Sequence, residues 1–219
     1  MKLLMITGLG GGRNLVRGKR GAFYNTLEEF HRYWERIDII LPQIDGVSEV
    51  KFFDNVFAHC SSWPLLYYPA WFLKKGAELH RQQRFNLMTV HEFPPFYNGI
   101  GARLLAGEIN VPYVLEVHHI PGYPKAGSLK EKIYKKSWQW FAKWDTAKAK
   151  AVRVVNQKET PEFLKRAGVL AEKLVYIPSM YIDLDVFKPY SDAAKKYDLV
   201  FCSRLEKNKG IYLLLEAIK

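Results

Sequence analysis

A pair of cations near the C-terminal end of this chain has the spacing to bind an anion. Arg204 and Lys209 lie in a short charged loop that ends at Gly210, and an apolar pattern with helical spacing follows. The N–H groups at the start of a helix carry partial positive charge, so cations beside them favour an anionic ligand. We therefore predict that Arg204 and Lys209 bind a phosphate or a diphosphate.

A run of glycines follows the first apolar segment of the chain. Gly10, Gly11 and Gly12 come after a predicted strand at residues 1–7, and glycines in a loop let the backbone approach a ligand closely. The dinucleotide fingerprint G-x-G-x-x-G fails because its third glycine would fall on Arg13, and no Gly-Lys-Ser/Thr sequence follows. A nicotinamide or ATP site is therefore not favoured. A tight turn without a ligand remains an equal alternative.

Histidines follow two further apolar segments. His91-Glu92 and His118-His119 lie at the ends of predicted buried strands. The carboxyl ends of parallel strands meet at one edge of a sheet, where ligands gather, so we expect both pairs to converge with the glycine loop. A histidine at a strand end is more often a packed residue than a catalytic one. No cluster of residues has the spacing of a metal site, and we predict no metal.

These residues need a scaffold of alternating strands and helices to bring them together. Predicted strands occupy residues 1–7, 37–42, 86–91, 111–117, 151–155 and 174–177, with another inside 50–58. Predicted helices start near Thr26, Leu65, Asn98, Ser128 and Thr160. This alternation predicts an α/β fold with a Rossmann-like, doubly wound parallel sheet covered on both faces.

The last stretch of the chain opens a second unit of the same kind. Leu199-Val200-Phe201 is typical of a buried strand, and apolar residues recur at helical spacing from Ile211. One strand and one helix cannot bury their own faces, so a further sheet is expected. We predict an N-terminal Rossmann-like domain at 1–178, a linker at 179–196, and the first strand, loop and helix of a truncated second Rossmann-like domain at 197–219.

Composition indicates a folded protein with anionic partners. Hydrophobic residues make up 48% of the chain, and 33 Lys and Arg against 22 Asp and Glu give a net charge of +11. This charge favours nucleotides, lipid headgroups or nucleic acid as partners. No secretory signal is evident, the apolar run at 63–73 is too short to span a membrane, and Cys60 and Cys202 suit a reducing compartment. We predict a cytoplasmic protein.

The segment 128–150 is the most basic long stretch. Ile133, Trp138, Phe141 and Trp144 lie on one side of its predicted helix, and lysines lie on the other. Tryptophans flanked by lysines suit a helix that lies on an anionic membrane, which would place the protein peripherally on the inner membrane face. The alternative, and the more common case, is a surface helix that buries its aromatic stripe in the core.

Several motifs of the chain resemble those of one enzyme family. That family has a strand followed by the motifs G-R-L, K-G and L-L-E-A. The corresponding residues here are Phe201-Cys202-Ser203-Arg204-Leu205, Lys209-Gly210 and Leu214-Leu215-Glu216-Ala217, which resemble the pattern with Ser203 in place of the usual glycine. Pro112 to His118 resembles a strand that ends in histidine in the acceptor-side domain of that family. The chain as a whole resembles the GT-B glycosyltransferases, specifically the large retaining family numbered four.

The resemblance implies transfer of a sugar from a nucleotide-diphosphate sugar to an acceptor, with retention and without a cofactor. Arg204 and Lys209 would neutralise the donor diphosphate, where preorganised cations stabilise the charge that develops in the transition state. His118 would be the catalytic residue that positions the reacting groups. The glycine loop Gly10–Gly12 would let backbone N–H groups approach phosphate or acceptor.

The same resemblance predicts that the donor pocket is incomplete in these 219 residues. The family's paired donor-binding glutamates would lie beyond Lys219. Glu108 and Glu116 share their spacing, but they belong to the N-terminal domain, and we interpret the match as chance. The chain by itself is therefore predicted to be inactive.

Two other functions stay open on the sequence. A Rossmann-like domain with a charge of +11 could be a non-catalytic module for nucleic acid or another polyanion, although no recognised nucleic-acid motif supports it. The chain could also be a truncated, inactive transferase domain. The sequence names neither sugar, nucleotide nor acceptor, and the basic segment 128–150 favours a lipid-linked or otherwise anionic acceptor.

Overall fold

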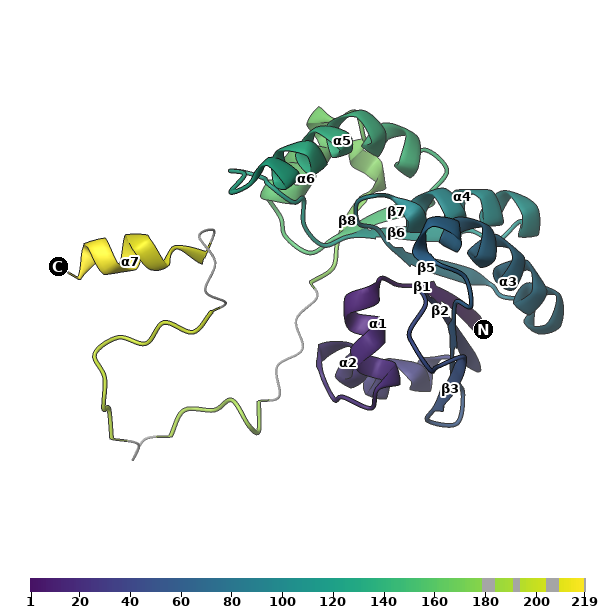
Figure 1. Ribbon diagram of the computed structural model, residues 1–219, viewed down its shortest axis with the longest axis horizontal. Coiled ribbons are helices and arrows are strands. Elements are labelled where there is room, and N and C mark those ends of the chain that lie inside the picture. The colour runs from purple at the N-terminus through teal and green to yellow at the C-terminus, as the bar shows by residue number, and fades with distance from the viewer. Residues whose placement is uncertain (179–183, 191–193, 204–208, 219) are drawn as a thin grey trace.

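The computed structural model describes residues 1–178, 184–190, 194–203 and 209–218. These residues form an eight-stranded sheet in the order β3-β4-β2-β1-β5-β6-β7-β8 (Figure 1). The strands are β1 (Lys2–Ile6), β2 (Arg36–Leu41), β3 (Glu49–Phe52), β4 (Val56–Cys60), β5 (Leu87–His91), β6 (Tyr113–Val117), β7 (Ala151–Val154) and β8 (Leu174–Tyr176). Neighbouring strands are parallel except for β3, which pairs antiparallel with β4. The predicted Rossmann-like parallel sheet is confirmed.

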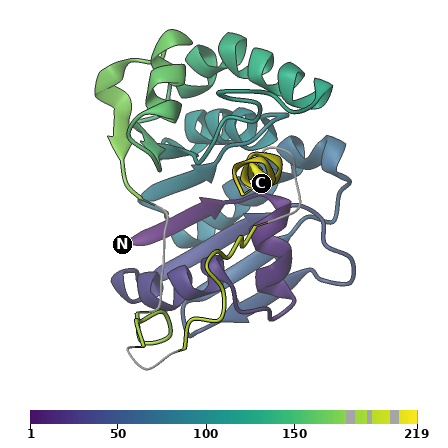
Figure 2. The ribbon, with the colours of Figure 1, turned by 90° about the vertical axis from the view of Figure 1, so that its left-hand side faces the viewer.

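Helices cover both faces of the sheet. They are α1 (Leu9–Val16), α2 (Ala22–Phe30), α3 (Tyr68–Gln83), α4 (Tyr97–Ile109), α5 (Leu129–Thr146) and α6 (Glu159–Arg166). The short 3₁₀ turns are η1 (His31–Tyr33), η2 (Leu65–Tyr67) and η3 (Ala171–Lys173), and a last helix, α7 (Ile211–Ala217), lies apart from the sheet (Figure 1). From β1 the chain adds strands toward the β3 edge of the sheet, and after β4 it returns to the other side of β1 and adds strands toward the β8 edge. Right-handed connections therefore place α1 and α2 on one face and α3 to α6 on the other (Figures 1 and 2).

Apolar side chains fill both layers between the sheet and its helices. Under α1 and α2, Leu15 and Leu27 pack in a buried cluster with Ile39. On the other face a larger cluster includes Phe72 from α3 and Trp138 from α5, both completely buried. Successive residues of a strand point to opposite faces, so strands that are covered on both sides read as continuous apolar runs.

The segment 50–58, which was predicted to contain a strand, contributes to two. β3 and β4 form a hairpin in which Glu49 pairs with His59 and Phe52 pairs with Val56. At the turn Phe53 adopts a left-handed backbone conformation with a φ of 52°. The hairpin places β3 at the edge of the sheet, where one side of the strand has no partner among the described residues.

The predicted strand at Leu199–Phe201 is wrong for this structure. Residues 194–203 contain no strand, and the Val200 residue is 74% exposed. A strand needs a neighbour to pair its backbone groups, and no described strand pairs with this segment. The predicted helix is confirmed, since α7 begins directly after Gly210, whose φ is 79°. The proposed second domain and its boundaries stay predictions.

Candidate active site

Two histidines meet at the carboxyl edge of the sheet. His91 is the last residue of β5, and His118 follows directly after β6, the next strand of the sheet. The two imidazole rings are stacked, with 4.3 Å between their centroids and 29° between their planes. The prediction that these strand ends converge is confirmed for His91 and His118.

A carboxylate and a guanidinium lie beside the histidines. Glu116 on β6 is in register with His91 on β5 and with Arg153 on β7, so the three side chains share one face of the sheet. Glu116 Oε2 is 3.4 Å from Nε2 of His118, and Glu116 Oε1 is 3.2 Å from Nη1 of Arg153. Arg153 also donates to the carbonyl oxygens of Ile177, at 3.2 Å, and Pro178, at 3.0 Å. We call His91, His118, Glu116 and Arg153 the histidine cluster.

The charges within the histidine cluster are set by burial and by the neighbouring groups. Burial raises the pKa of Glu116, but the close imidazole of His118 and the charge of Arg153 outweigh it, so the pKa is lowered. Burial and the neighbouring His118 lower the pKa of His91 to about 4. Near neutral pH the cluster therefore contains an ionised carboxylate and a neutral His91. The neutral ring has one nitrogen that accepts and one that donates a hydrogen bond.

The predicted glycine loop is a helix in the structure. Gly10–Gly12 belong to α1, which begins at Leu9 with Gly8 as its N-cap residue. The first hydrogen bond of this helix runs from the N–H of Gly12 to the carbonyl oxygen of Gly8, at 3.4 Å. The N–H groups of the first turn of a helix have no partner within the helix. The start of α1 can therefore bind an anion, which is the role predicted for the glycine loop.

The start of α1 lies at the same edge of the sheet as the histidine cluster. β1 is the neighbour of β5, and Ile6 near the end of β1 is in register with Val90 of β5. Val90 is in turn in register with Leu115 of β6. The parallel register therefore brings the end of β1, and with it the start of α1, to the level at which β5 and β6 end.

The glycines of α1 differ in what surrounds them. A side chain at Gly12 would collide with Leu41, which is fully buried, so close packing of the helix on β2 requires glycine there. A Cβ atom at Gly11 would make ordinary contact with Phe23, 3.6 Å away. A Cβ atom at Gly10 would have no atom within 4 Å. Packing therefore explains why residue 12 is glycine, whereas nothing in the packing requires glycine at residue 10.

Glu92 does not join the histidine cluster, although it follows His91 directly. Its residue is 1% exposed and its side chain lies on Gly99 together with the fully buried Asp145 of α5. Burial raises the pKa of Asp145 to about 7. Burial and the charge of Asp145 raise the pKa of Glu92 well above its usual range. Two adjacent buried carboxylates repel each other, so this pair retains a proton near neutral pH.

Of the two predicted diphosphate-binding cations, the structure describes only Lys209, and it does not lie beside the histidine cluster. Arg204 lies outside the described residues. Lys209 is exposed and precedes Gly210 at the start of α7, as the sequence predicts. Figure 1 shows α7 apart from the sheet that carries His118. Convergence of Lys209 with His118 therefore remains a prediction.

Within the described residues, no group of three or more His, Cys, Asp or Glu side chains is arranged to hold a metal ion. The described helices also include none with the length and apolar character needed to cross a lipid bilayer. The groups that the histidine cluster offers to a ligand are imidazole, carboxylate and guanidinium.

Comparison with known proteins identifies the fold. No protein-family model and no curated protein matches the sequence. Among solved structures, sucrose-phosphate synthase from Thermosynechococcus elongatus aligns with 100% of this chain and 59% of its own, with a TM-score of 0.69 and 14% sequence identity. The chain has a GT-B-like fold. The match shows an α/β Rossmann-like architecture and does not by itself show a family.

Two further solved structures, with lower TM-scores, are of proteins whose descriptions name a nucleotide sugar as substrate or ligand. Anabaena HepE in complex with UDP-glucose has a TM-score of 0.51 and 17% identity, covering 87% of this chain and 47% of its own. UDP-N-acetylglucosamine 2-epimerase from Rickettsia bellii has a TM-score of 0.51 and 10% identity, covering 80% and 44%. This chain spans between 44% and 59% of the three matched chains. Identities this low show the fold alone.

Sequence reasoning missed two members of the histidine cluster. Glu116 lies two residues before His118, and the period of two in a strand places alternate side chains on one face, so the sequence contained a signal for it. This signal was not used, because Glu116 was considered only for its spacing from Glu108, which resembles the paired donor-binding glutamates. Arg153 is 37 residues from Glu116, and only the register of β6 with β7 brings them together.

Proposed function

We propose that this chain belongs to a glycosyltransferase that takes a sugar from a nucleotide-diphosphate sugar and transfers it, with retention, to an acceptor. The observation that carries the proposal is the histidine cluster beside the start of α1, at the carboxyl edge of a GT-B-like sheet. Open α/β sheets bind their ligands at this edge. The nucleotide-sugar enzymes among the fold neighbours support the same class of substrate.

In the proposed reaction His118 positions the reacting groups and Glu116 holds its imidazole. Glu116 and Arg153 form a charged pair behind the ring, with 3.2 Å between Oε1 and Nη1. Such a pair limits the movement of Glu116 and keeps the imidazole directed toward the ligand. The N–H groups of Gly10 and Gly11 would approach a phosphate or the acceptor, whereas that of Gly12 bonds within the helix.

The donor diphosphate is assigned to Arg204 and Lys209 by the resemblance of their motif. Support comes from Lys209 and Gly210, which precede a helix as the motif requires. The proposal includes a second Rossmann-like domain that starts near residue 197 and carries most of the donor pocket.

Calorimetric titration with UDP-glucose tests the role of the histidine cluster. Because most of the proposed donor pocket belongs to the second domain, the wild-type chain should bind UDP-glucose only weakly. The His118→Ala variant should bind at least about tenfold more weakly still, because one lost hydrogen bond to a charged ligand costs about 1.5 kcal/mol. His80→Ala on α3 is the matched control and should bind like the wild type. Equal affinity of the His118→Ala variant and the wild type would remove His118 from the proposed site.

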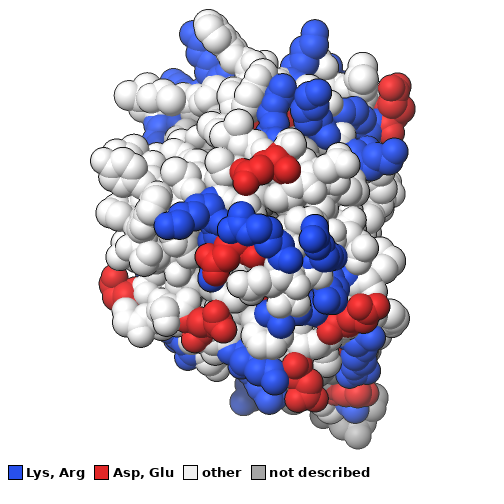
Figure 3. Space-filling model, turned by 90° about the vertical axis from the view of Figure 1, so that its right-hand side faces the viewer, with Lys and Arg blue, Asp and Glu red and all other residues white. Residues whose placement is uncertain are grey.

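A non-catalytic polyanion module is the alternative function. It would need a continuous basic surface, and Figure 3 shows acidic side chains among the Lys and Arg side chains of one face of the molecule. Titration with single-stranded RNA and with UDP-glucose at matched salt separates the two functions. Tight RNA binding with a steep salt dependence would favour the alternative.

A peripheral membrane contact through α5 remains part of the proposal. The two interpretations of segment 128–150 apply to different faces of the helix: Trp138 is completely buried, whereas Leu129, Ile133 and Trp140 are 73%, 58% and 78% exposed. Lys136 lies over the Trp140 ring, 5.6 Å from its centroid. An exposed row of apolar side chains with lysines suits the boundary between headgroups and acyl chains.

Co-sedimentation with liposomes tests this contact. The wild type should sediment with vesicles that contain anionic lipid, and Trp140→Ser should reduce the bound fraction several-fold. Trp63→Ser, which removes another exposed tryptophan away from α5, is the control. Equal binding by the wild type and Trp140→Ser, or no binding to any vesicle, would contradict the proposed contact.

A further inference from the structure

A cavity lies at the β3–β4 side of the sheet, away from the histidine cluster. It has a volume of about 360 Å³ and lies between the β3–β4 hairpin and the first half of α3. Its walls include the polar side chains of Glu49, His59, Lys74 and Lys75 and the indoles of Trp63 and Trp71. β4 and β6 are four strand spacings apart in the sheet, which is roughly 19 Å. This cavity is therefore separate from the site around His118.

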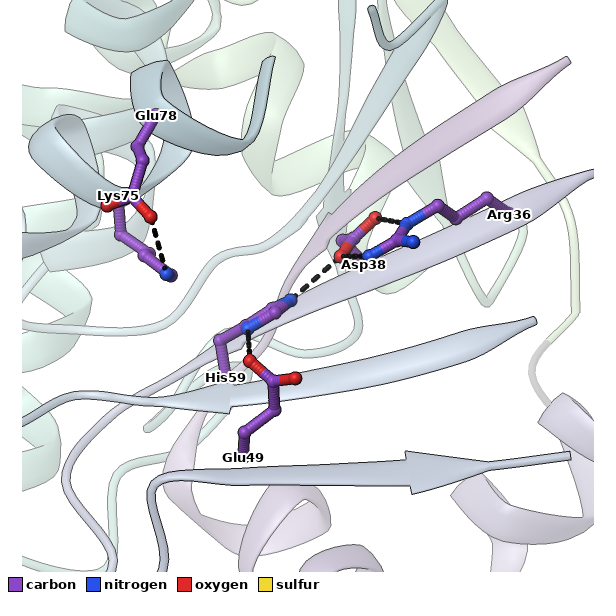
Figure 4. Close-up of polar contacts among 6 residues, drawn as sticks. All are labelled: Arg36, Asp38, Glu49, His59, Lys75 and Glu78. Carbon is purple, nitrogen blue, oxygen red and sulfur yellow. Dashed lines mark hydrogen bonds and ion pairs between the residues drawn. The ribbon is translucent and has the colours of Figure 1, made fainter. Parts of the chain in front are cut away.

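A chain of charged groups fixes the histidine in the wall of the cavity. Arg36 donates two hydrogen bonds to Asp38, at 2.7 and 3.0 Å, and Asp38 is completely buried (Figure 4). The Nε2 atom of His59 lies 2.7 Å from Asp38 Oδ1. Burial alone would raise the pKa of Asp38, but the hydrogen bonds from His59 and Arg36 lower it. An ionised carboxylate only accepts, so Nε2 of His59 carries the proton that it donates.

The other ring nitrogen of His59 is buried against Glu49. Nδ1 is 2.8 Å from Oε2 of Glu49, in a close contact that lacks the alignment of a hydrogen bond. His59 is 3% exposed, whereas the side chain of Glu49 is 55% exposed and can turn toward a ligand. Asp38 and Glu49 thus enclose the ring between them, and the exposed Glu49 carboxylate is the group available to hydroxyl groups.

The facing wall of the cavity comes from α3 and the segment before it. Lys75 forms an ion pair with Glu78 at 3.0 Å, and Figure 4 shows the pair on the helix opposite His59. Lys74 lies 6.0 Å from the centroid of the Trp63 ring. Trp63 is 36% exposed and Trp71 is 8% exposed, so the indoles offer the cavity both an accessible and a fixed aromatic surface.

We propose that this cavity binds the ring of a neutral pyranose sugar. The C–H groups on one face of a pyranose form an apolar surface that packs on an indole, and its hydroxyl groups both donate and accept hydrogen bonds. The cavity supplies acceptors in Glu49 and Glu78 and donors in Lys74 and Lys75. Because these two acids and two lysines balance, the lining favours a neutral polyol over a strongly anionic ligand. The volume lies at the lower end of the range for small-molecule sites.

Ligand-observed NMR titration with methyl glucoside, methyl galactoside and methyl mannoside tests the proposal on the full chain. At least one glycoside should bind with a millimolar dissociation constant, while the open-chain polyol ribitol should not. Trp63→Ala should weaken binding at least tenfold, and Glu49→Gln should weaken it several-fold. Both residues are partly exposed, so both variants should keep the fold. Trp140→Ala on α5 is the matched control and should bind like the wild type.

Several outcomes would overturn the pyranose site. They are no binding by any of the three glycosides, full binding by Trp63→Ala, or more than tenfold tighter binding of glucuronate than of methyl glucoside. The last result would indicate an anion site instead. His118→Ala should leave glycoside binding unchanged, so failure of this proposal and failure of the proposed transferase site are distinguishable.

Discussion

At the scale of single residues, the histidine cluster and the buried carboxyl pair show how neighbouring positions acquire opposite roles. His91 and Glu92 are adjacent in the chain, yet His91 stacks on His118 at one face and Glu92 is buried beside Asp145. A strand end sends successive side chains to opposite sides of the sheet. The functional interpretation therefore applies to His91, while Glu92 belongs to the packing between β5, α4 and α5.

The two outer glycines of α1 should respond oppositely to alanine. Gly12→Ala should destabilise the protein by about 1–3 kcal/mol, because the added carbon overpacks the core at Leu41. Gly10→Ala should stabilise it by about 0.5–1 kcal/mol, because alanine is the better helix former and has open space there. Urea unfolding measures both effects.

If the start of α1 receives a ligand, Gly10→Ala should weaken UDP-glucose binding while it raises stability. Gly107→Ala, at another helical glycine with no atom near its added carbon, is the control and should change stability alone. Unchanged UDP-glucose affinity of Gly10→Ala would argue against close ligand approach at that position.

The Glu92 and Asp145 pair should make stability fall as pH rises. Burial raises the pKa of Asp145 to about 7, and burial together with the charge of Asp145 raises that of Glu92 well above its usual range. The folded state then holds protons that the unfolded state releases above about pH 4, so the stabilisation is fully present below that pH and is lost as pH rises through 7. Asp145→Asn should be more stable than the wild type at pH 8, by about 2 kcal/mol, and much less so at pH 5.

Urea unfolding between pH 5 and 8 measures this pH dependence. Glu108→Gln removes an exposed carboxylate from α4 and serves as the control, with a pH dependence like that of the wild type. The lowered pKa of His91 makes stability rise with pH in both proteins, so the quantity compared is the stability difference between Asp145→Asn and the wild type. A difference that does not grow between pH 5 and 8 would contradict the raised pKa values. The guanidinium of Arg103 is the nearby cation that limits the shift at Asp145.

At the scale of elements, α5 shows how one helix combines structural and interaction surfaces. Its buried side carries Trp138, Ala142 and Asp145 into the core, and its outer side exposes Ile133 and Trp140. The basic and aromatic pattern in the sequence suits both a core helix and an interfacial helix, because aromatic residues occur on more than one side. Only packing against α4 and α6 decides which aromatics are covered.

The start of α5 should depend on its cap. Ser128 Oγ accepts a hydrogen bond from the N–H of Glu131 at 3.2 Å, and Glu131 Oε2 accepts one from the N–H of Gly127 at 2.6 Å. Ser128→Ala should lower the free energy of unfolding by about 1 kcal/mol, measured by urea titration. Ser137→Ala is the matched control within the same helix. Its hydroxyl only bonds back to the carbonyl of Ile133, so its loss should be close to neutral.

At the scale of the whole molecule, the sheet and the segment after β8 behave as different units. Residues 1–178 contain both hydrophobic clusters, whereas Val186, Phe187, Val200 and Leu213 after β8 are 62%, 70%, 74% and 71% exposed. The alignment with sucrose-phosphate synthase includes both parts. The exposed apolar residues are consistent with the proposed second domain, in which they would be covered.

A chain that ends at Pro178 should fold independently. It retains all eight strands and the contacts of Arg153 with the carbonyl oxygens of Ile177 and Pro178. Its thermal midpoint, measured by circular dichroism, should match that of the 219-residue chain within a few degrees. A chain that ends at Arg166, before β8, is the control and should be clearly less stable. Loss of cooperative unfolding in the 1–178 chain would contradict the predicted domain boundary.

The sequence by itself determined the alternating elements and the sheet edge at which His91 and His118 meet, because local apolar period and parallel topology are enough for both. Tertiary structure decided the outcome where the local sequence preference and the packing favour different conformations. It made Gly10–Gly12 helical, since packing on β2 outweighs the poor helix propensity of glycine. It left Leu199–Phe201 without a strand, because a strand exists only beside a partner. It also joined Arg153 to Glu116 and His59 to Asp38, because residues distant in sequence meet only through strand register.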